Sequence, residues 1–354
     1  MSNKNVSLFL SHYLSIVFLL TYFIVYGQSE PKTPTIKLPE ISKEIISMRD
    51  QDQKYRKKWG KLVRAGKTKS KKIKRISKEL TTIDRNNTKR IREIVEQYGW
   101  PTYDLVGEKA SKCAWLVVQH ADRNPLVQMY CLPLLKDAVD RYQADPSNYA
   151  YLYDRVQIAK GEKQLYATQS TTNNGLVTGH FQPIEDESNV QRRREEMRVR
   201  LLGVGSASPT AETVEAYAEA LGFEYEVPSK EEAIQRDKVW AKAYQENIEM
   251  AHQAMKSKDF STAIDYYNKA IQSHGHIQTE DYVELARAIS ISKHENCSGA
   301  FYYLIKAAIR GWEGINEFDK HEDFKNIKLA NPDNWLDLMT VVDELKLKKK
   351  KAKG

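Results

Sequence analysis

The sequence predicts an all-α protein in which an irregular helical domain is followed by a short module of helical hairpins. Apolar residues recur at spacings of three and four along most of the chain, which is the period of one face of an α-helix. After Trp240, small and large apolar residues follow the spacing of paired helices. With 354 residues, the chain is long enough for two domains that each have a core.

The N-terminal segment predicts export. Residues 6–25 form a nearly uncharged apolar run that follows Lys4, and this is the pattern of a secretory signal peptide cleaved near Gly27. We therefore expect residues 1–27 to be removed and the protein to be periplasmic or extracellular. The alternative is an uncleaved helix that anchors the protein in a membrane, because about 20 apolar residues can span a bilayer. The polar linker at residues 28–39 favours cleavage, since it has no cluster of Lys or Arg.

The first domain is expected at residues 40–226. Its helical pattern begins at Glu40, and Asp84 has the position of a helix N-cap. Pro133 is expected to kink or break its helix. Residues 169–190, rich in Thr, Asn and Gly, are expected to form a loop. The expected helices are a segment from Glu40 through the basic stretch, interrupted at Gly60 and Gly66, and segments at about 84–98, 108–119, 126–141, 148–159 and 210–221.

A basic stretch from Lys54 to Lys78 carries most of the positive excess in a chain of net charge +8. Because Trp59 lies within it, the stretch has one signature of nucleic-acid binding. A solvated helix face, or the tip of a hairpin near Gly66, explains the charge more simply. We therefore expect no nucleic-acid partner, and at most a weak contact of residues 54–78 with an anionic envelope surface.

A second helical module follows the linker at residues 227–236. Its two helix pairs can be aligned through Met250, Ala251, Ala254, Phe260, Ala263, Ile264, Tyr267 and Ala270, and through Ala288, Ile291, Ala300, Leu304, Ala307 and Ala308. The pattern resembles the tetratricopeptide repeat, although Cys297 stands where an aromatic residue is usual. Two repeats are fewer than a free-standing array needs. We therefore expect the helix around 335–345 and docking on the first domain to complete the module at 237–345, with residues 346–354 as a disordered basic tail.

Four polar residues are candidates for catalysis: His120, Asp122, Asp154 and Arg155. An Asp that orients a His, beside an Arg that binds an anion, is the minimum for general-base hydrolysis or for anion binding. The same residues can be structural, with the His at a helix end and the Asp and Arg in an inter-helix salt bridge. The candidates for ligand binding, which can equally form a buried polar network, are Asp50, Gln51, Trp100, Gln119, Gln164 and Gln169.

No motif for a catalytic nucleophile or a metal is present. The sequence contains no Gly-x-Ser-x-Gly, His-Glu-x-x-His or Cys-x-x-Cys pattern, and His180 is the only other His in the first domain. We expect no metal site, and the sequence identifies no cofactor. Three cysteines are too few for a disulfide framework. Cys113, Cys131 and Cys297 are most simply small buried hydrophobic residues, although Cys113 and Cys131 can pair if their helices are neighbours.

An ordered set of short motifs in the first domain resembles a known family. The motifs are Met48, Asp50-Gln51, Arg56, Asp84, Asn87, Gly99-Trp100-Pro101, Gly107, Ala114-Trp115, Gln119-His120-Ala121-Asp122, Ala150-Tyr151-Leu152, Asp154-Arg155-Val156, Gln164 and Thr168-Gln169. Together they are similar to domain-of-unknown-function family 6624 over about residues 40–222. Ala167 departs from this pattern, because a Gly is expected there, and the basic insertion between Arg56 and Asp84 is a second departure. The resemblance implies no activity.

These features predict an exported protein that binds another protein through its repeats, on a groove lined by Tyr266, Tyr302 and Tyr303. If that face packs against the first domain, the repeats serve instead as a structural buttress. A third hypothesis is a hydrolase or an anion-binding domain that uses His120, Asp122, Asp154 and Arg155. The balance of the sequence is against an enzyme, since no activated nucleophile is evident.

Overall fold

The computed structural model describes residues 36–173, 176–200, 213–271, 277–292, 300–312, 314, 320–330 and 332–353. The chain divides into a unit of residues 1–37 and a compact unit from Leu38 to Gly354, and only the second is considered below. The expected signal peptide at residues 1–27 lies outside the described residues. Among the helices in the described ranges, none combines the length and the apolar character needed to cross a bilayer.

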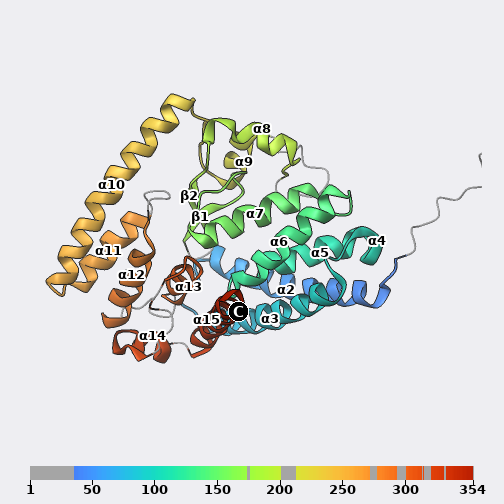
Figure 1. Cartoon of the computed structure of the whole chain (residues 1–354), viewed down its shortest axis with the longest axis horizontal. Coiled ribbons are helices and arrows are strands. Elements are labelled where there is room, and N and C mark those ends of the chain that lie inside the picture. Colours follow the sequence, from blue (N-terminus) through green and yellow to red (C-terminus); the bar gives the residue numbers. More distant parts are fainter. Residues whose placement is uncertain are drawn as a thin grey trace, which may run out of the picture. The chain divides into compact units, whose positions relative to one another are not determined.

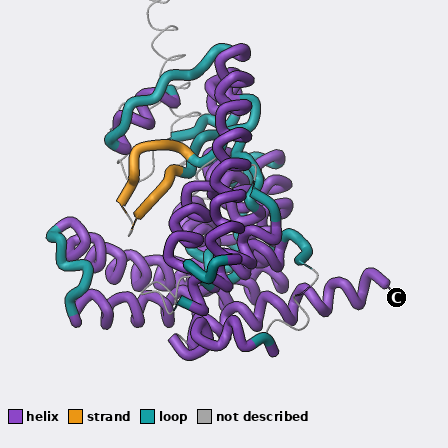
Figure 2. The backbone as a smooth tube through the Cα atoms, turned by 90° about the vertical axis from the view of Figure 1, so that its left-hand side faces the viewer, coloured by secondary structure: helices purple, strands orange, loops and turns teal. Residues whose placement is uncertain are grey.

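The expected all-α class is confirmed (Figure 1). Helix makes up most of the described backbone, and the described strands form one two-stranded sheet (Figure 2). The helices are α2 (Pro39–Arg64), α3 (Lys71–Tyr98), α4 (Tyr103–Val106), α5 (Glu108–Gln119), α6 (Pro125–Asp140), α7 (Pro146–Lys160), α8 (Val190–Glu196), α9 (Val214–Leu221), α10 (Lys230–Lys256), α11 (Phe260–Ile271), α12 (Thr279–Ile291), α13 (Phe301–Ile309), α14 (Lys325–Ala330) and α15 (Pro332–Lys353), and the strands are β1 (Ser170–Asn173) and β2 (Leu176–Phe181).

Two long helices, α2 and α3, form the hairpin that carries the basic stretch. Ser70 caps α3 by accepting a hydrogen bond from the backbone N–H of Ile73. Asp84 was expected to be an N-cap but lies inside α3, because the helix begins thirteen residues earlier at Lys71. Helix α2 also runs through Gly60 without interruption. Apolar spacing therefore predicts the presence of these helices better than it predicts where they begin.

Helix α5 lies at the centre of the first domain. Its Ala110, Ala114, Trp115 and Val118 are almost completely buried, and α2, α3, α6 and α7 all contact it. Pro133 was expected to kink or break its helix, but α6 continues through it. Because α5 packs against several neighbouring helices, its C-terminal end is placed where side chains from different helices can meet.

The segment after α7 is attached to the domain by one buried carboxylate. Asp154 is completely buried and accepts hydrogen bonds from the backbone N–H groups of Leu165, Tyr166 and Thr168, and from Thr168 Oγ1. Burial raises the pKa of Asp154 to about 6, although these hydrogen bonds oppose the increase. Inside this clamp, Ala167 is buried and has a left-handed backbone with φ of 50°.

The expected loop at residues 169–190 contains the two strands. They pair antiparallel, with Ser170 opposite Phe181 and Thr172 opposite Val177. Gln164 closes the base of the hairpin, because its side-chain amide donates to the carbonyl oxygens of Gln169 and Gln182. Thr and Val suit a pleated strand, so a segment without helical spacing forms strands here and not an irregular loop.

We predict that Asp154→Asn destabilises the protein. The substitution places an amide NH2 among backbone N–H donors, and leaving such buried groups unpaired costs about 1–3 kcal/mol, or several degrees in melting temperature. Calorimetry of the full chain tests this. Asp140→Asn is the matched control, because Asp140 is exposed and pairs only with Lys136 one helical turn away, so its melting temperature should be nearly unchanged. Equal melting temperatures of the two variants would contradict the structural role of Asp154.

Helices α10 to α13 pack as successive antiparallel neighbours with a hydrophobic core of their own. Ala251, Ala254 and Ala263 lie where α10 and α11 approach, and the Tyr267 side chain is buried between helices. Cys297 lies outside the described residues. The tail, expected to be disordered, continues α15 as helix to Lys353, since Lys favours helix and neither Gly nor Pro interrupts the run.

Helices α13 and α15 connect the C-terminal helical module, formed by α10 to α15, to the first domain. Lys306 donates to the carbonyl oxygen of Ile158 at 2.9 Å, and Arg310 Nη1 donates to that of Lys160 at 2.9 Å. Gly161 ends α7 in a left-handed conformation, and a Cβ atom there would lie 2.8 Å from Arg310 Nη1. Glycine at 161 therefore allows the close approach of Arg310 that this contact needs.

Candidate functional site

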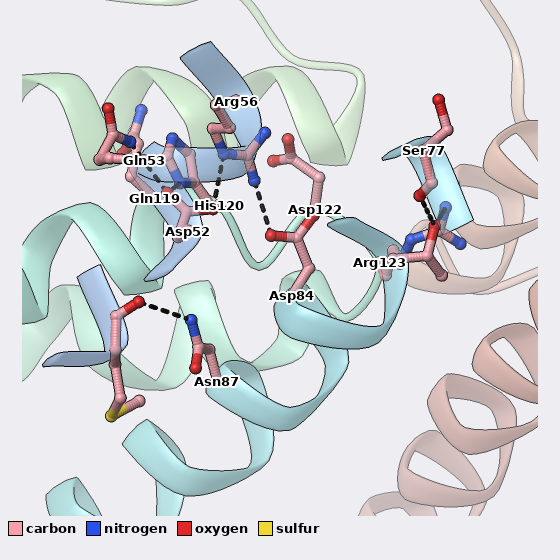
Figure 3. A network of polar contacts seen from close by, with 12 residues as sticks. Asp52, Gln53, Arg56, Ser77, Asp84, Asn87, Gln119, His120, Asp122 and Arg123 are labelled. Atoms are coloured by element: carbon pink, nitrogen blue, oxygen red, sulfur yellow. Dashed lines mark hydrogen bonds and ion pairs between the residues drawn. The ribbon is translucent and has the colours of Figure 1, made fainter. Parts of the chain in front are cut away.

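A polar network lies where the ends and faces of several first-domain helices meet (Figure 3). It is formed by Asp52 and Arg56 of α2, Asp84 of α3, His120 at the C-terminus of α5, Asp122 in the next turn and Arg155 of α7. Asp52 is placed by the helical spacing of α2, because it follows the buried Met48 by one turn and therefore faces inward.

Asp52 and His120 form the buried part of the network. His120 Nδ1 lies 3.0 Å from Asp52 Oδ2, and Arg56 Nε donates to Asp52 Oδ1 at 2.7 Å. Burial alone would raise the pKa of Asp52, but the hydrogen bond and the charge of His120, together with the charge of Arg56, outweigh it and lower the pKa to about 2. Burial lowers the pKa of His120, although the hydrogen bond and the charge of Asp52 oppose the decrease. A carboxylate at Nδ1 selects the tautomer with the proton there, which leaves Nε2 as an acceptor.

Asp84 is the second carboxyl group bound by Arg56, whose Nη2 donates to Asp84 Oδ1 at 2.6 Å. Burial raises the pKa of Asp84 to about 7, with the Asp52 and Asp122 carboxylates adding to the increase and Arg56 opposing it. Figure 3 shows the Asp122 side chain next to Arg56 and Asp84. The network thus places a carboxyl group with a pKa of about 7 in the same cluster as a histidine with a lowered pKa.

Asp122 and Arg155 form the more exposed edge. Arg155 Nη1 donates to both carboxylate oxygens of Asp122, at 3.2 and 3.0 Å, and Gln128 Nε2 donates to Oδ1 at 3.1 Å. Arg155 and Asp154 therefore belong to different clusters although they are neighbours in sequence, because Asp154 is turned toward the loop after α7. Of the four catalytic candidates, the structure brings together His120, Asp122 and Arg155 and separates Asp154.

The next residue, Arg123, links this turn to the C-terminal helical module formed by α10 to α15. Arg123 Nη1 donates to Asn334 Oδ1 at 2.6 Å and to Asp337 Oδ2 at 3.0 Å, and Nη2 donates to Thr81 Oγ1 at 3.0 Å. Its guanidinium also lies 5.5 Å from the centre of the Phe301 ring. The turn after α5 therefore carries two residues of the network, His120 and Asp122, and one residue, Arg123, that contacts α13 and α15.

The ligand-binding candidates are spread over the first domain. Asp50 and Gln51 are exposed and outside the network, and Asp50 pairs with Arg49. Sequence reasoning missed Asp52 as a site residue because Arg49-Asp50-Gln51-Asp52-Gln53 contains two Asp-Gln pairs. The sequence does indicate the second pair, Asp52-Gln53. Asp52 lies four residues from both Met48 and Arg56, so the three share one face of a helix. For Asp84 the sequence indicates a helix cap, a family motif and, if it lies close to Asp50, an oxygen-rich site, but not the contact with Arg56.

The remaining ligand-binding candidates are buried or belong to the hairpin base. Trp100 and Gln119 are buried, and Trp100 Nε1 and Gln119 Oε1 have no hydrogen-bond partner among the described residues. Gln119 Nε2 donates to the carbonyl oxygen of Tyr151 at 3.4 Å. Gln164 and Gln169 bond to each other through backbone and side-chain groups, so they connect the strands and lie outside the network.

The three tyrosines expected to line a groove have different surroundings. Tyr303 stacks on Tyr282 within the module, with ring centres 6.3 Å apart, and Tyr266 is partly buried beside Lys269. Tyr302 keeps 39% of its surface exposed. Burial raises the pKa of Tyr302, with Arg123 opposing and Asp122 and Asp84 contributing. Tyr302 therefore lies on the side of α13 that approaches the network.

The described residues contain no group of three or more His, Cys, Asp or Glu arranged to hold a metal ion. Cys113 and Cys131 are free and buried, and Cys297 lies outside the described residues. Burial raises the pKa of Cys131 to about 12, so its thiolate, the reactive form, is scarce at neutral pH.

Fold and network together define an all-α protein with a polar cluster at a helix junction. A family model described as "Family of unknown function (DUF6624)" matches residues 39–205, so the likeness that the motifs indicated is confirmed for this part of the chain. All six network residues lie inside the match. No match was found among curated proteins or among solved structures. The tetratricopeptide-like interpretation of residues 237–345 stays a prediction.

Asp84 gives a signed prediction for pH. Its pKa of about 7 in the folded protein is above the ordinary value of 3.8, so between these values the folded state binds more protons and its stability increases as the pH falls. Asp84→Asn removes this titration. We expect the free energy of unfolding of the wild type, relative to Asp84→Asn, to rise from about pH 8 to about pH 5 in urea titrations.

His120 titrates in both proteins of this comparison, so its contribution largely cancels. Asp140→Asn serves as control, because Asp140 is exposed, and its difference from the wild type should be flat. A difference between the wild type and Asp84→Asn that does not depend on pH would contradict the raised pKa.

Proposed function

We propose that the polar network is a general acid–base site that hydrolyses acyl bonds. His120 Nε2 takes a proton from water, the water oxygen attacks the acyl carbon, and the protonated Asp84 carboxyl donates a proton to the leaving group. Asp52 is the positioning residue that keeps the His120 proton on Nδ1. Acid and base roles are divided between two groups whose environments move their pKa values in opposite directions, Asp84 upward and His120 downward.

The observation that carries the proposal is that only one of the two ring nitrogens of His120 has a hydrogen bond to a described residue. Nδ1 is bonded to the buried Asp52, whereas Nε2 has no hydrogen bond to any described residue and is not among the buried unpartnered atoms. A fifth of the His120 side chain is exposed, so water can reach it. A purely structural histidine is expected to use both nitrogens, and a general base needs one of them free.

Anion binding is less well supported as the primary role. Arg56 is already bonded to Asp52 and Asp84, and Arg155 to Asp122. Each guanidinium is therefore neutralised by carboxylates, and no excess positive charge remains for a phosphate or sulfate. An uncharged ester or amide suits this charge balance better.

For the repeat module we propose the buttress role, with binding of a partner protein as the second candidate. The contacts of Lys306, Arg310 and Arg123 with the first domain support the buttress. Binding is supported by the exposed apolar side chains of Ile234, Val239 and Met250 on α10. Export after cleavage near Gly27 stays a prediction.

For the basic stretch at residues 54–78 we propose a weak contact with an anionic envelope surface. Apart from Arg56, every Lys and Arg from Lys54 to Lys78 is exposed, and none of these exposed cations has an ion pair with a described residue. Unpaired positive charge on one hairpin favours an anionic surface as partner.

The hydrolase proposal is tested with p-nitrophenyl acetate and a panel of amides. His120→Gln keeps the size and polarity of the side chain but removes the base, and we expect hydrolysis to fall about 100-fold or more. His252→Gln is the matched control, because His252 is exposed on α10 outside the network. Rates that are the same in the wild type and both variants would refute the role of His120.

The buttress is tested with a double-mutant cycle on Arg123 and Asp337. Asp337 is 8% exposed and binds both Arg85 and Arg123, so we expect Asp337→Ala and Arg123→Ala each to cost about 1–3 kcal/mol in urea unfolding, with a coupling energy of about 1 kcal/mol. The exposed pair Lys136 and Asp140 provides the reference cycle, where the coupling should be about 0.5 kcal/mol or less. Equal coupling in the two cycles would remove support for the buttress.

A further inference from the structure

A crevice of about 300 Å³ lies between the first domain and the last helix. It is bounded by α3, by the turn and first residues of α6, and by α15, so both modules contribute to it. Its volume is at the lower end of the range for pockets that bind small organic molecules, and such pockets are frequent where two modules meet. None of its residues belongs to the polar network, so the inference does not depend on the proposed hydrolysis.

Two kinds of surface face each other in this crevice. Val127, Leu336 and the Thr340 side chain provide apolar area. The rest is strongly charged, with four cations, Arg85, Lys89, Arg92 and Arg123, and only two carboxylates, Asp337 and Glu344. The lining therefore has an excess of two positive charges, which favours a ligand with a negative group and an apolar body.

The carboxylates fix the arginines in place. Arg85 donates to both oxygens of Asp337, at 2.7 and 2.9 Å, and Arg92 Nη1 donates to Glu344 Oε1 at 2.5 Å. Ion pairs that already exist in the free protein reduce the entropy lost on binding, because these long side chains need not be ordered by the ligand.

Two groups in the lining have bonding capacity left over. Lys89 has no ion pair or hydrogen bond with any described residue, although its neighbours in the crevice are all paired. Asn124 donates through Nδ2 to Glu344 at 3.2 Å, but its buried Oδ1 has no partner in the part of the chain that the structure describes. A ligand that supplies a negative charge to Lys89 and an N–H or O–H to Asn124 Oδ1 would satisfy both groups.

We propose that this crevice binds a small aromatic or aliphatic carboxylate that carries a hydroxyl or amino group. The carboxylate pairs with Lys89, the apolar body lies against Val127 and Leu336, and the hydroxyl or amino group donates to Asn124 Oδ1. Because the ligand contacts α3, α6 and α15 at once, its binding also strengthens the docking of α15 on the first domain and raises the melting temperature.

The probe is 4-hydroxybenzoate, titrated into the full chain by calorimetry near neutral pH. We expect saturable binding with a Kd of about 0.1–1 mM, as suits so small a ligand. The neutral analogue 4-hydroxybenzamide should bind about tenfold or more weakly, since it lacks the charge, and benzoate should bind more weakly because it lacks the donor for Asn124.

Two variants locate the site. Lys89→Glu reverses the unpaired charge, and Thr340→Trp fills the crevice, so each should weaken binding of 4-hydroxybenzoate about tenfold or more. Lys78→Glu on α3 and Leu347→Trp on α15 are the matched controls, because both positions are exposed and outside the crevice, and they should keep the wild-type Kd.

The proposal is overturned if 4-hydroxybenzoate does not saturate the protein by about 10 mM, if the benzamide binds equally well, or if Lys89→Glu binds like Lys78→Glu. Since Lys89 is exposed and unpaired, its variant is expected to fold even if Thr340→Trp does not, and it decides the outcome alone.

Discussion

The polar network depends on the hydrogen bonds that the Asp52 carboxylate makes with His120 and Arg56. One oxygen lies beside His120 at the end of α5, and the other accepts from Arg56, which continues to Asp84 on α3. A buried carboxylate is costly unless it is paired, so α2, α3 and α5 have to meet with these side chains in register. The same requirement leaves His120 with one nitrogen engaged and the other open, which is the asymmetry that the acid–base proposal uses.

Neighbouring residues of one turn contact the polar network and the C-terminal helical module formed by α10 to α15. His120 and Asp122 face the network, and Arg123 contacts Asn334 and Asp337 of α15. A shift of α15 would therefore be transmitted to the turn that carries the candidate base. Coupling of this kind needs no chain of contacts through the core, since a single turn takes part in both sets of contacts.

Sequence reasoning predicted what depends on local spacing. The all-α class follows from apolar residues three and four apart, and the similarity to the family over residues 39–205 followed from ordered motifs. The strands at 170–181 were missed, because short Thr-rich segments carry no helical period, and their pairing depends on Gln164. Asp84 was missed for another reason: its partner Arg56 lies on α2, and spacing within α3 cannot reveal that contact. For Asp52, spacing within α2 indicates an inward-facing position beside Arg56, but it cannot reveal the contact with His120 at the end of α5.

Ala167 shows what the clamp around Asp154 provides. An L-residue with a side chain loses about 1–2 kcal/mol in the left-handed region, and the resemblance implied a glycine at this position. The loop nevertheless holds alanine at a φ of 50°, so its tertiary hydrogen bonds, those to Asp154 and those from Arg194 to the carbonyl oxygens of Tyr166 and Ala167, must offset that penalty. The conformation of residues 165–168 is thus imposed by these contacts and not by the preference of the local chain, and a peptide of this segment alone would adopt a different backbone.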